Sequence, residues 1–201
     1  MPPQTLTDLK QQERESRRLL ILNAARDLFA INDFQQVTVR QIARQAGVGV
    51  GTIYNYYQNL DDLFLDIFLK NAEDLVAQID LELARPDPSL ADCCRIYVGY
   101  LHGHMTFYQM MGHFMLGGGE PGPEAIDRLN HLMRRLMDRL ETIIRKTTPA
   151  RENTRIRAHA LFSALNGVMI SYARYPGRSD QDIQSHTTRL AEVMATIFSN
   201  P

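Results

Sequence analysis

The stretch TVRQIARQAGVGVGTIYNYY, residues 38–57, determines how the rest of the chain is interpreted. A capping box that starts at Thr38 predicts a short helix over residues 39–46, and Gly47 is expected to end it. The apolar spacing predicts a second short helix over residues 50–57. Two short helices joined by a tight turn that contains glycine are typical of a helix-turn-helix.

The side chains of this stretch separate into an inner and an outer set. Ile42, Ala43 and Ile53 fall where the two helices must face each other, and Val48 fills the turn. The outer set consists of Val50, Thr52, Tyr54, Asn55 and Tyr56. Hydroxyl, amide and aromatic groups of this kind suit contacts to phosphates and base edges in the major groove of DNA. A helical hairpin inside an all-helical core is the alternative, but such a packing helix would show a plainly polar side.

Helical spacing continues on both sides of this stretch, and no segment alternates with the period of a strand. Further helices are expected over residues 15–31, 60–84, 124–146, 153–175 and 181–198, with one helix or two over residues 89–115 that break near Gly103 or Gly112. Asn32 and Asp33, which both tolerate the left-handed conformation, are expected to end the first helix, and Pro149 is expected to end the helix over residues 124–146. The sequence therefore predicts an all-α fold of about nine helices, with three short helices followed by a larger bundle.

Composition and charge exclude several classes of protein. The chain has 201 residues, of which 44% are hydrophobic and 22% charged, so it can bury a core. No run of about 18 apolar residues predicts a membrane span, and the polar N-terminus does not read as a secretory signal. The net charge is −1, although residues 1–60 carry seven basic and five acidic side chains, which points weakly to an anionic partner there.

Residues 17–64 closely resemble the DNA-binding domain of the TetR family of bacterial transcriptional regulators. The resemblance is carried by ILNAA and LFA within residues 21–30, Phe34, TVRQIA at 38–43, AGV at 46–48, GTIY at 51–54 and DDLF at 61–64. It implies a DNA-binding domain over residues 17–60, preceded by a flexible polar arm over residues 1–16. It also implies an effector-binding and dimerisation domain over residues 61–201, which matches the family by architecture only.

The resemblance also implies which residues contact DNA. Thr38 resembles the family's phosphate contact, Arg40 stands where some members contact DNA, and Tyr57 matches a position that packs inward. The recognition helix and its start are represented by Gly49, Val50, Gly51, Thr52, Tyr54, Asn55 and Tyr56. Leu60 replaces the lysine that the family usually uses for a phosphate contact, so Arg14, Arg17 and Arg18 of the arm are candidates to compensate.

The sensing half is expected to bind a small hydrophobic or aromatic effector. Residues 97–115, YVGYLHGHMTFYQMMGHFM, are crowded with aromatic and methionine side chains, which are adaptable walls for an apolar ligand. The expected ligand-binding set is Tyr97, Tyr100, His104, Phe107, Tyr108, Met111, Phe114, Met133, Met137, Asn166 and Met169. An ordinary aromatic core is the alternative.

Neither a metal nor a cofactor is expected. His102 and His104 are two residues apart and do not face each other on a helix, and no fitting further ligands accompany His113. Cys93 and Cys94 are adjacent and cannot easily form a disulfide, which favours a reducing cytoplasm. They are expected to be buried thiols, with a redox sensor as the alternative.

The last two helices are expected to form a dimer interface. Ala160, Ala164 and Gly167 make a stripe of small residues beside Val168, and Leu190, Val193 and Ile197 form an apolar face on the final helix. Packing within one subunit is the alternative. A dimer would read a near-palindromic operator in double-stranded DNA.

The expected function is a repressor that a small effector releases from its operator. A corepressor-dependent or activating regulator, or a DNA-binding dimer without an effector, stays open as an alternative. A helical metal-dependent enzyme is a distant alternative, because the sequence has no nucleophile motif, no paired carboxylates near the histidines and no phosphate-binding glycine loop.

Overall fold

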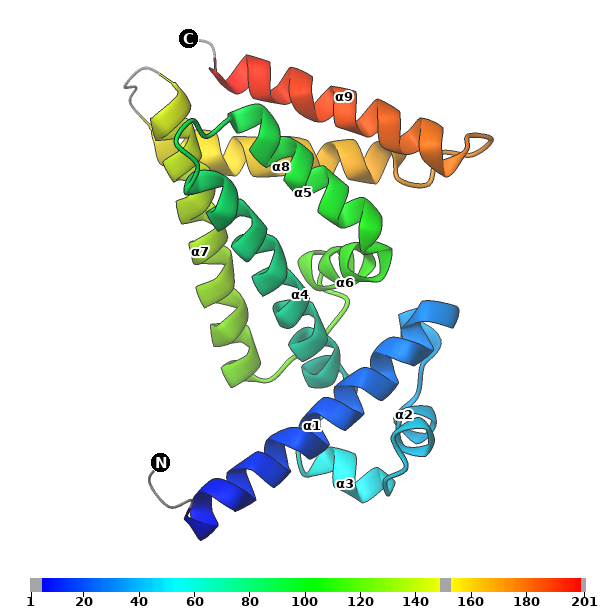
Figure 1. The fold of residues 1–201 in the computed structure, drawn as a ribbon. Coiled ribbons are helices and arrows are strands. Elements are labelled where there is room, and N and C mark those ends of the chain that lie inside the picture. Colours follow the sequence, from blue (N-terminus) through cyan, green and yellow to red (C-terminus); the bar gives the residue numbers. More distant parts are fainter. Residues whose placement is uncertain (1–4, 149–152, 200–201) are drawn as a thin grey trace. The chain divides into compact units, whose positions relative to one another are not determined.

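The computed structural model describes residues 5–148 and 153–199, and the regular structure within these ranges is helical (Figure 1). The elements are α1 (Leu6–Ile31), the 3-10 turn η1 (Phe34–Gln36), α2 (Val39–Ala46), α3 (Val50–Tyr54), α4 (Leu60–Leu83), α5 (Leu90–Gly103), α6 (Met105–Met115), α7 (Pro123–Thr147), α8 (Thr154–Tyr172) and α9 (Asp180–Ser199). The predicted all-α fold of about nine helices is confirmed. Pro149, the expected end of α7, lies outside the described residues.

The described chain forms two compact units. The first unit runs up to Phe68 and includes Gln109–Ile126, and the second consists of Leu69–Tyr108 and the chain from Asp127 onward. The domain boundary expected from the sequence lies after residue 60. As a result, α4, α6 and α7 each begin in one unit and end in the other. No helix of the described ranges is long and apolar enough to cross a bilayer.

Helix α1 begins nine residues earlier than the apolar spacing predicted. Thr5 and Asp8 form a capping box, in which Thr5 N–H donates to Asp8 Oδ2 over 2.9 Å and Asp8 N–H donates to Thr5 Oγ1 over 3.2 Å. The hydrogen bonds that the Thr5 backbone N–H and the Thr5 hydroxyl donate to the carboxylate lower the pKa of Asp8. The arm expected over residues 1–16 is therefore helical from Leu6, which corrects the prediction of a flexible segment there.

Helix α1 ends at Ile31, followed by Asn32 and Asp33 as the sequence predicts. Asn32 has φ −134° and Asp33 has φ −62°, so both are extended and neither adopts the left-handed conformation that it tolerates. Asp33 instead accepts a hydrogen bond from Gln35 N–H over 3.1 Å and starts η1. An aspartate in this role stabilises a turn through its side chain, which is why no left-handed residue is needed.

Helix α2 has the bounds that its sequence predicts. Thr38 and Gln41 form the expected capping box, and Gly47 ends the helix with φ +67°, a conformation that glycine adopts at little cost. Val48 N–H donates to Ala43 O over 3.0 Å and closes the turn. The local signals at both ends of α2 were therefore sufficient to place it.

The core of the first unit joins α1, η1 and α4 through aromatic rings. Phe64 meets Phe29 edge to face at 5.2 Å between ring centroids and Phe34 at 5.4 Å. Ile42 and Ile53 are buried between the helices of the helix-turn-helix. This packing sets which face of α3 is left exposed.

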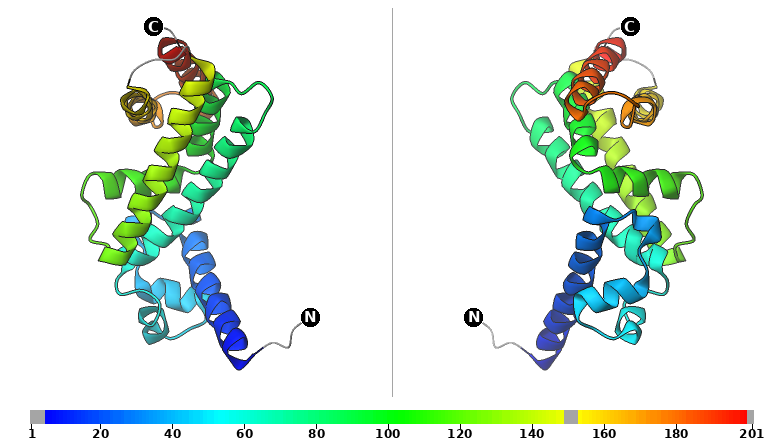
Figure 2. Two further views of the ribbon diagram at one scale, coloured as in Figure 1. Left: turned by 90° about the vertical axis from the view of Figure 1, so that its left-hand side faces the viewer. Right: turned by 90° about the vertical axis from the view of Figure 1, so that its right-hand side faces the viewer.

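In the second unit, α5 packs against α8 and α9, and α8 packs against α9 (Figure 2). The chain breaks between α5 and α6 at His104, next to Gly103, which is one of the two breaks expected. The core between these helices contains Tyr97, Leu101, Leu161 and Leu165, all buried.

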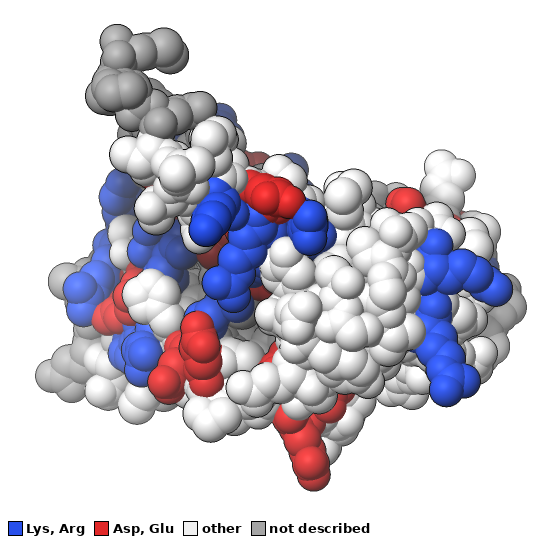
Figure 3. All heavy atoms as spheres, turned by 90° about the horizontal axis from the view of Figure 1, so that it is seen from below, with Lys and Arg blue, Asp and Glu red and all other residues white. Residues whose placement is uncertain are grey.

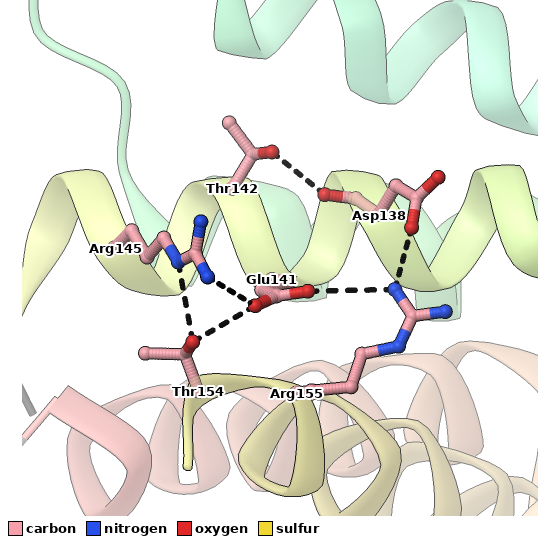
Figure 4. A network of polar contacts seen from close by, with 6 residues as sticks. All are labelled: Asp138, Glu141, Thr142, Arg145, Thr154 and Arg155. Carbon is pink, nitrogen blue, oxygen red and sulfur yellow. Dashed lines mark hydrogen bonds and ion pairs between the residues drawn. The ribbon is translucent and has the colours of Figure 1, made fainter. Parts of the chain in front are cut away.

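A polar network fastens the start of α8 to α7 (Figure 4). Glu141 accepts hydrogen bonds from Arg145 over 2.7 Å and from Thr154 over 2.9 Å. Arg155 bridges Glu141 and Asp138, at 3.4 and 2.6 Å. Because Glu141 is mostly buried, these contacts position the first turn of α8 more firmly than exposed ion pairs would.

Candidate nucleic-acid interface

The second helix of the helix-turn-helix presents the outer set of side chains that the sequence predicted. Ile53 is buried, which fixes the rotation of α3 about its axis. Tyr54 is 54% exposed and Val50 37%, Asn55 is exposed, and Thr52 and Tyr56 are half-buried. Gly49 and Gly51 are also exposed, so the backbone at the start of α3 is open to a close approach.

Helix α3 ends at Tyr54, earlier than the expected residue 57. Tyr56 N–H and Tyr57 N–H both donate to Ile53 O, over 2.9 and 3.0 Å, and form a turn. This turn directs Tyr57 into the core, which agrees with the inward position that the resemblance implied. The exposed face is therefore short and is followed directly by a buried anchor.

Helix α2 supplies cationic and hydroxyl groups beside this face. Thr38 and Arg40 are exposed, and the hydroxyl of Thr38 bonds Gln41 Oε1 over 2.7 Å as part of the capping box. Arg44 is exposed as well and was not among the predicted contacts. Figure 3 shows arginine and lysine side chains on two sides of the face drawn, with a broad uncharged stretch between them.

The arginines expected to act in the arm have different surroundings. Arg14 lies over the ring of Tyr56, 5.9 Å from its centroid, so it is fixed beside the recognition helix by a cation–π contact. Arg17 pairs with Glu13 over 2.6 Å on an exposed helix surface, where such a pair is weak and easily exchanged for a phosphate. Both arginines are thus available to DNA.

Arg18 is not available in the same way, which corrects its assignment as a phosphate contact. Its Nη2 lies 2.5 Å from both carboxylate oxygens of Asp66, which is 3% exposed. Tyr57 OH donates to Asp66 Oδ2 over 2.7 Å. Burial opposes the charge on Arg18, but the hydrogen bond and charge of Asp66 outweigh it and raise the pKa of Arg18. Burial, followed by the charge of Asp66, raises the pKa of Tyr57, so its hydroxyl stays a donor.

We expect Arg17→Ala and Arg18→Ala to separate into two phenotypes. Arg17→Ala should leave the free energy of unfolding unchanged and lower the salt dependence of DNA binding by about one phosphate contact per subunit. Arg18→Ala leaves the buried carboxylate of Asp66 without its cation and should cost about 3–5 kcal/mol of unfolding free energy. Urea unfolding and a salt titration of DNA affinity measure the two effects. Equal stability of the two variants would contradict the assignment of Arg18.

The loop between α6 and α7 is attached to the start of α4 within the first unit. Asp61 Oδ2 accepts from Glu120 N–H over 3.0 Å, and Asp62 Oδ1 accepts from Gly122 N–H over 2.8 Å. Asn59 caps α4 by accepting from Asp62 N–H over 2.7 Å. The two carboxylates in the first turn of α4 therefore hold a loop from far along the chain.

His113 of α6 strengthens the same attachment. Its Nε2 lies 3.7 Å from Asp61 Oδ1, and its Nδ1 lies 3.4 Å from Gln35 Nε2 in η1. Its ring meets Phe34 edge to face at 5.5 Å. His113 thus joins α6 to two elements of the DNA-binding region, a role that the sequence did not reveal.

We expect Gly118→Ala to destabilise the protein by about 1–3 kcal/mol, because it overpacks this attachment. An added Cβ would lie 2.4 Å from His113 Nδ1 and 3.1 Å from its backbone oxygen. Gly112→Ala is the matched control, since no atom lies within 4 Å of its added Cβ and alanine favours the helix. Urea denaturation compares the two variants, and equal stability would show that the histidine moves aside freely.

The structure brings only some of the expected effector-binding residues together. Tyr97 OH donates to Asn166 Oδ1 over 3.2 Å, and the Tyr100 ring stacks on His104 and meets Phe107 edge to face. Tyr97, Tyr100, Phe107, Met111, Met137 and Met169 are buried, Tyr108, Phe114, Met133 and Asn166 are half-buried, and His104 is exposed. Met111 and Phe114 belong to the first unit and the others to the second. As an effector site, this set stays a prediction.

A cavity of about 350 Å³ lies elsewhere in the second unit, at the α8–α9 corner. It is lined by Tyr172, Tyr175, Arg178, Asp182, Ile183 and His186, none of which was expected to bind an effector. The ring of Tyr172 meets His186 edge to face at 4.8 Å. No periodic signal in the sequence marks this corner, because its lining comes from a loop and two helix ends.

His102 and the two cysteines have structural surroundings. His102 Nε2 lies 2.7 Å from Thr187 Oγ1, and burial lowers the pKa of His102. Within residues 5–148 and 153–199, no three His, Cys, Asp or Glu side chains are grouped to hold a metal. Burial raises the pKa of Cys93 and raises that of Cys94 to about 12, so neither has the low pKa of a redox sensor.

The expected dimer residues divide between exposed and buried positions. Ala160 and Gly167 are exposed on α8, and Val193 and Ile197 are 50% and 57% exposed on α9. Ala164 and Leu190 are half-buried. Val168 is buried in its own subunit, which corrects its assignment to the interface. The dimer residues expected from the sequence did not include Ile156 and Ile170, which are 67% and 75% exposed beside the small residues.

A helix-turn-helix whose second helix turns hydroxyl, amide and aromatic groups to solvent defines a DNA-binding protein. Residues 21–67 match the family model described as bacterial regulatory proteins, tetR family. This match covers 47 of the 201 residues, and over it the chain is similar to the DNA-binding region of that family. The relatives and the structural neighbour described below are named as regulators.

Two curated relatives show how far the likeness extends. The fatty acid metabolism regulator protein of Bacillus subtilis is 29% identical over 72 residues, which cover 36% of this chain and 37% of that protein. The transcriptional regulator AlkX of Mycobacterium tuberculosis is 26% identical over 186 residues, which cover 87% of this chain and 84% of that protein. The chain thus spans little more than a third of the first relative's length.

A solved structure of similar fold is the transcriptional regulator FadR from Bacillus subtilis in complex with stearoyl-CoA. It matches with a TM-score of 0.67 at 17% identity, over 89% of this chain and 97% of that one. At this identity the likeness shows the fold alone.

Proposed function

We propose that this protein is a homodimeric repressor that binds a near-palindromic operator and is released from it by an apolar effector. The observation that carries the proposal is the recognition helix α3, with Ile53 buried and Tyr54 and Asn55 exposed. One short helix reads only a few base pairs, so specific binding needs two copies of it in adjacent major grooves.

The exposed faces of α8 and α9 support dimerisation. Ile156, Ala160, Gly167 and Ile170 lie at helical spacing on α8, and all are exposed. Val193 and Ile197 add an exposed apolar face on the helix that packs beside α8. Small residues flanked by large apolar ones let two helices approach closely, and burying them removes apolar surface from water.

The buried aromatic residues of the second unit support an apolar effector. Tyr97, Tyr100 and Phe107 are buried there beside leucine, valine and cysteine side chains, and the Tyr97–Asn166 pair is a polar anchor. Ligand sites have this character: mostly apolar walls with a small number of placed polar groups. A structural neighbour was solved with stearoyl-CoA, and a relative is a fatty acid metabolism regulator, so we propose an effector with a long acyl chain.

The effector acts on DNA binding through continuous helices. Helices α4, α6 and α7 each contain residues of both units. A movement of the helix ends that belong to the second unit would therefore move the helix ends that belong to the first unit. The loop that Asp61 and Asp62 hold, together with His113, ties α6 to the start of α4. Effector and operator then weaken each other by the same factor, typically about 5- to 150-fold.

The test starts with selection of duplexes from a random library by the purified protein. Fluorescence anisotropy then measures affinity for the enriched duplex with oleate, stearoyl-CoA or polar metabolites added. We expect an inverted repeat to be enriched and the acyl compounds alone to lower its affinity. Enrichment of no sequence would overturn the DNA-binding proposal. Tighter binding with acyl compounds would show a corepressor, and release by polar metabolites alone would refute the apolar effector.

A further inference from the structure

We propose that Asp66 is a positioning residue for DNA recognition, which sets the orientation of the recognition helix from the second turn of α4. The inference rests on the proposed DNA-binding function and goes beyond it, because Asp66 lies outside the helix-turn-helix and contacts no DNA in that reading. It is carried by the buried contacts among Arg18, Tyr57 and Asp66.

The cluster joins three parts of the first unit through one carboxylate. Arg18 comes from α1, Tyr57 from the turn after α3, and Asp66 from α4. The guanidinium lies 2.5 Å from both oxygens of Asp66, and the phenol donates over 2.7 Å to one of them. Bidentate and charge-assisted hydrogen bonds of this kind are directional, so they fix the relative rotation of the elements they join.

The position of Tyr57 lets this contact affect the orientation of the recognition helix. Tyr57 follows the exposed residues Tyr54 and Asn55 by two or three positions, and its backbone N–H bonds Ile53 O. Ile53, the fourth of the five residues of α3, is one buried anchor, and Tyr57 is a second one just after the C-terminal end of the helix. Without the second anchor, α3 is free to pivot about Ile53, and the outer side chains change direction.

Burial makes the cluster sensitive to the loss of any member. Asp66 is 3% exposed, and Tyr57 is buried as well. Water cannot readily replace a missing hydroxyl there, whereas it would at an exposed ion pair. Val50, Tyr54 and Asn55 of the outer face are exposed, so the direction of these side chains depends on the buried anchors at Ile53 and Tyr57.

The variant Tyr57→Phe removes only the hydroxyl and tests the proposal directly. Base contacts demand exact direction, whereas phosphate contacts tolerate small shifts. We therefore expect affinity for the duplex enriched by the unaltered protein to fall by about tenfold, the size of one weakened base contact. Affinity for mixed-sequence DNA of the same length should stay within about twofold. A purely structural defect would lower both affinities by the same unfolded fraction, so their ratio is the diagnostic readout.

Thr187→Val is the matched control. Thr187 is a buried threonine of α9 in the second unit whose hydroxyl donates to Ile183 O over 2.9 Å, so this variant also removes one hydroxyl from a buried hydrogen bond. We expect its ratio of specific to mixed-sequence affinity to equal that of the unaltered protein.

A double variant shows whether Tyr57 acts through Asp66. Once Asp66→Ala is present, which leaves no acceptor for the phenol, adding Tyr57→Phe should not lower the affinity ratio further. The proposal is overturned if Tyr57→Phe alone keeps the full ratio, or if Thr187→Val lowers it equally. These outcomes differ from failure of the proposed function, in which the unaltered protein would enrich no duplex. Tyr57→Phe keeps the test decisive if Asp66→Ala does not fold.

Discussion

Gly167→Leu is expected to convert the dimer into a monomer and to lower operator affinity by more than about 100-fold, because binding by two linked recognition helices becomes binding by one. Gly167 is exposed on α8, and no atom of its own subunit lies within 4 Å of an added Cβ. A leucine therefore fits the subunit, and it disrupts only a second backbone that approaches closely. Sedimentation velocity and anisotropy with the enriched duplex measure the two losses.

If Gly167 faces only water, the same substitution is expected to stabilise the protein instead of dissociating a dimer. Leucine in place of glycine inside an exposed helix stabilises it by about 0.8 kcal/mol, so the variant would then be more stable and bind DNA normally. Gln78→Leu is the control, because it adds the same side chain at an exposed position of α4. A dimeric Gly167→Leu protein that binds DNA would contradict the placement of the interface.

Tyr54→Ala is expected to lower affinity for the enriched duplex by about 30-fold or more. A contact to a base is worth about 1–3 kcal/mol, and a symmetric dimer loses it in both half-sites. The substitution leaves the core intact, since Tyr54 is 54% exposed and alanine suits a helix. We expect the free energy of unfolding to change by less than about 0.5 kcal/mol, as for other exposed sites.

Tyr175→Ala is the control for this prediction. Tyr175 is 50% exposed in the second unit, so the same atoms are removed from a similarly open position. Anisotropy titrations with the enriched duplex compare the two variants. If both bind like the unaltered protein, α3 does not read the operator through Tyr54.

Local signals in the sequence predicted the helix-turn-helix well. Thr38, Gly47 and the apolar positions between them interact within a few residues of chain, so spacing alone places α2 and its turn. Apolar periodicity does not locate the start of α1, because Leu6 and Leu9 are the only apolar side chains of residues 6–14. The pattern Thr5–x–x–Asp8 is a capping signal that could have located it.

Contacts between distant residues were beyond a reading of one sequence. Arg18 and Asp66 are separated by 48 residues, and the sequence near Arg18 does not indicate that it pairs with a buried carboxylate. His113 lies 78 residues beyond Gln35, and its contacts likewise depend on the folded chain. A cluster of aromatic residues such as Tyr97 and Tyr100 has the same spacing in a core as in a pocket, so the pattern could not distinguish them.

Native mass spectrometry of the protein mixed with the enriched duplex tests the central claim most directly, because it counts subunits on DNA. The account predicts two subunits on each duplex and a free protein that is a dimer. A single subunit bound to the duplex with the affinity of the unaltered protein would contradict it, since one recognition helix would then be sufficient for reading the operator.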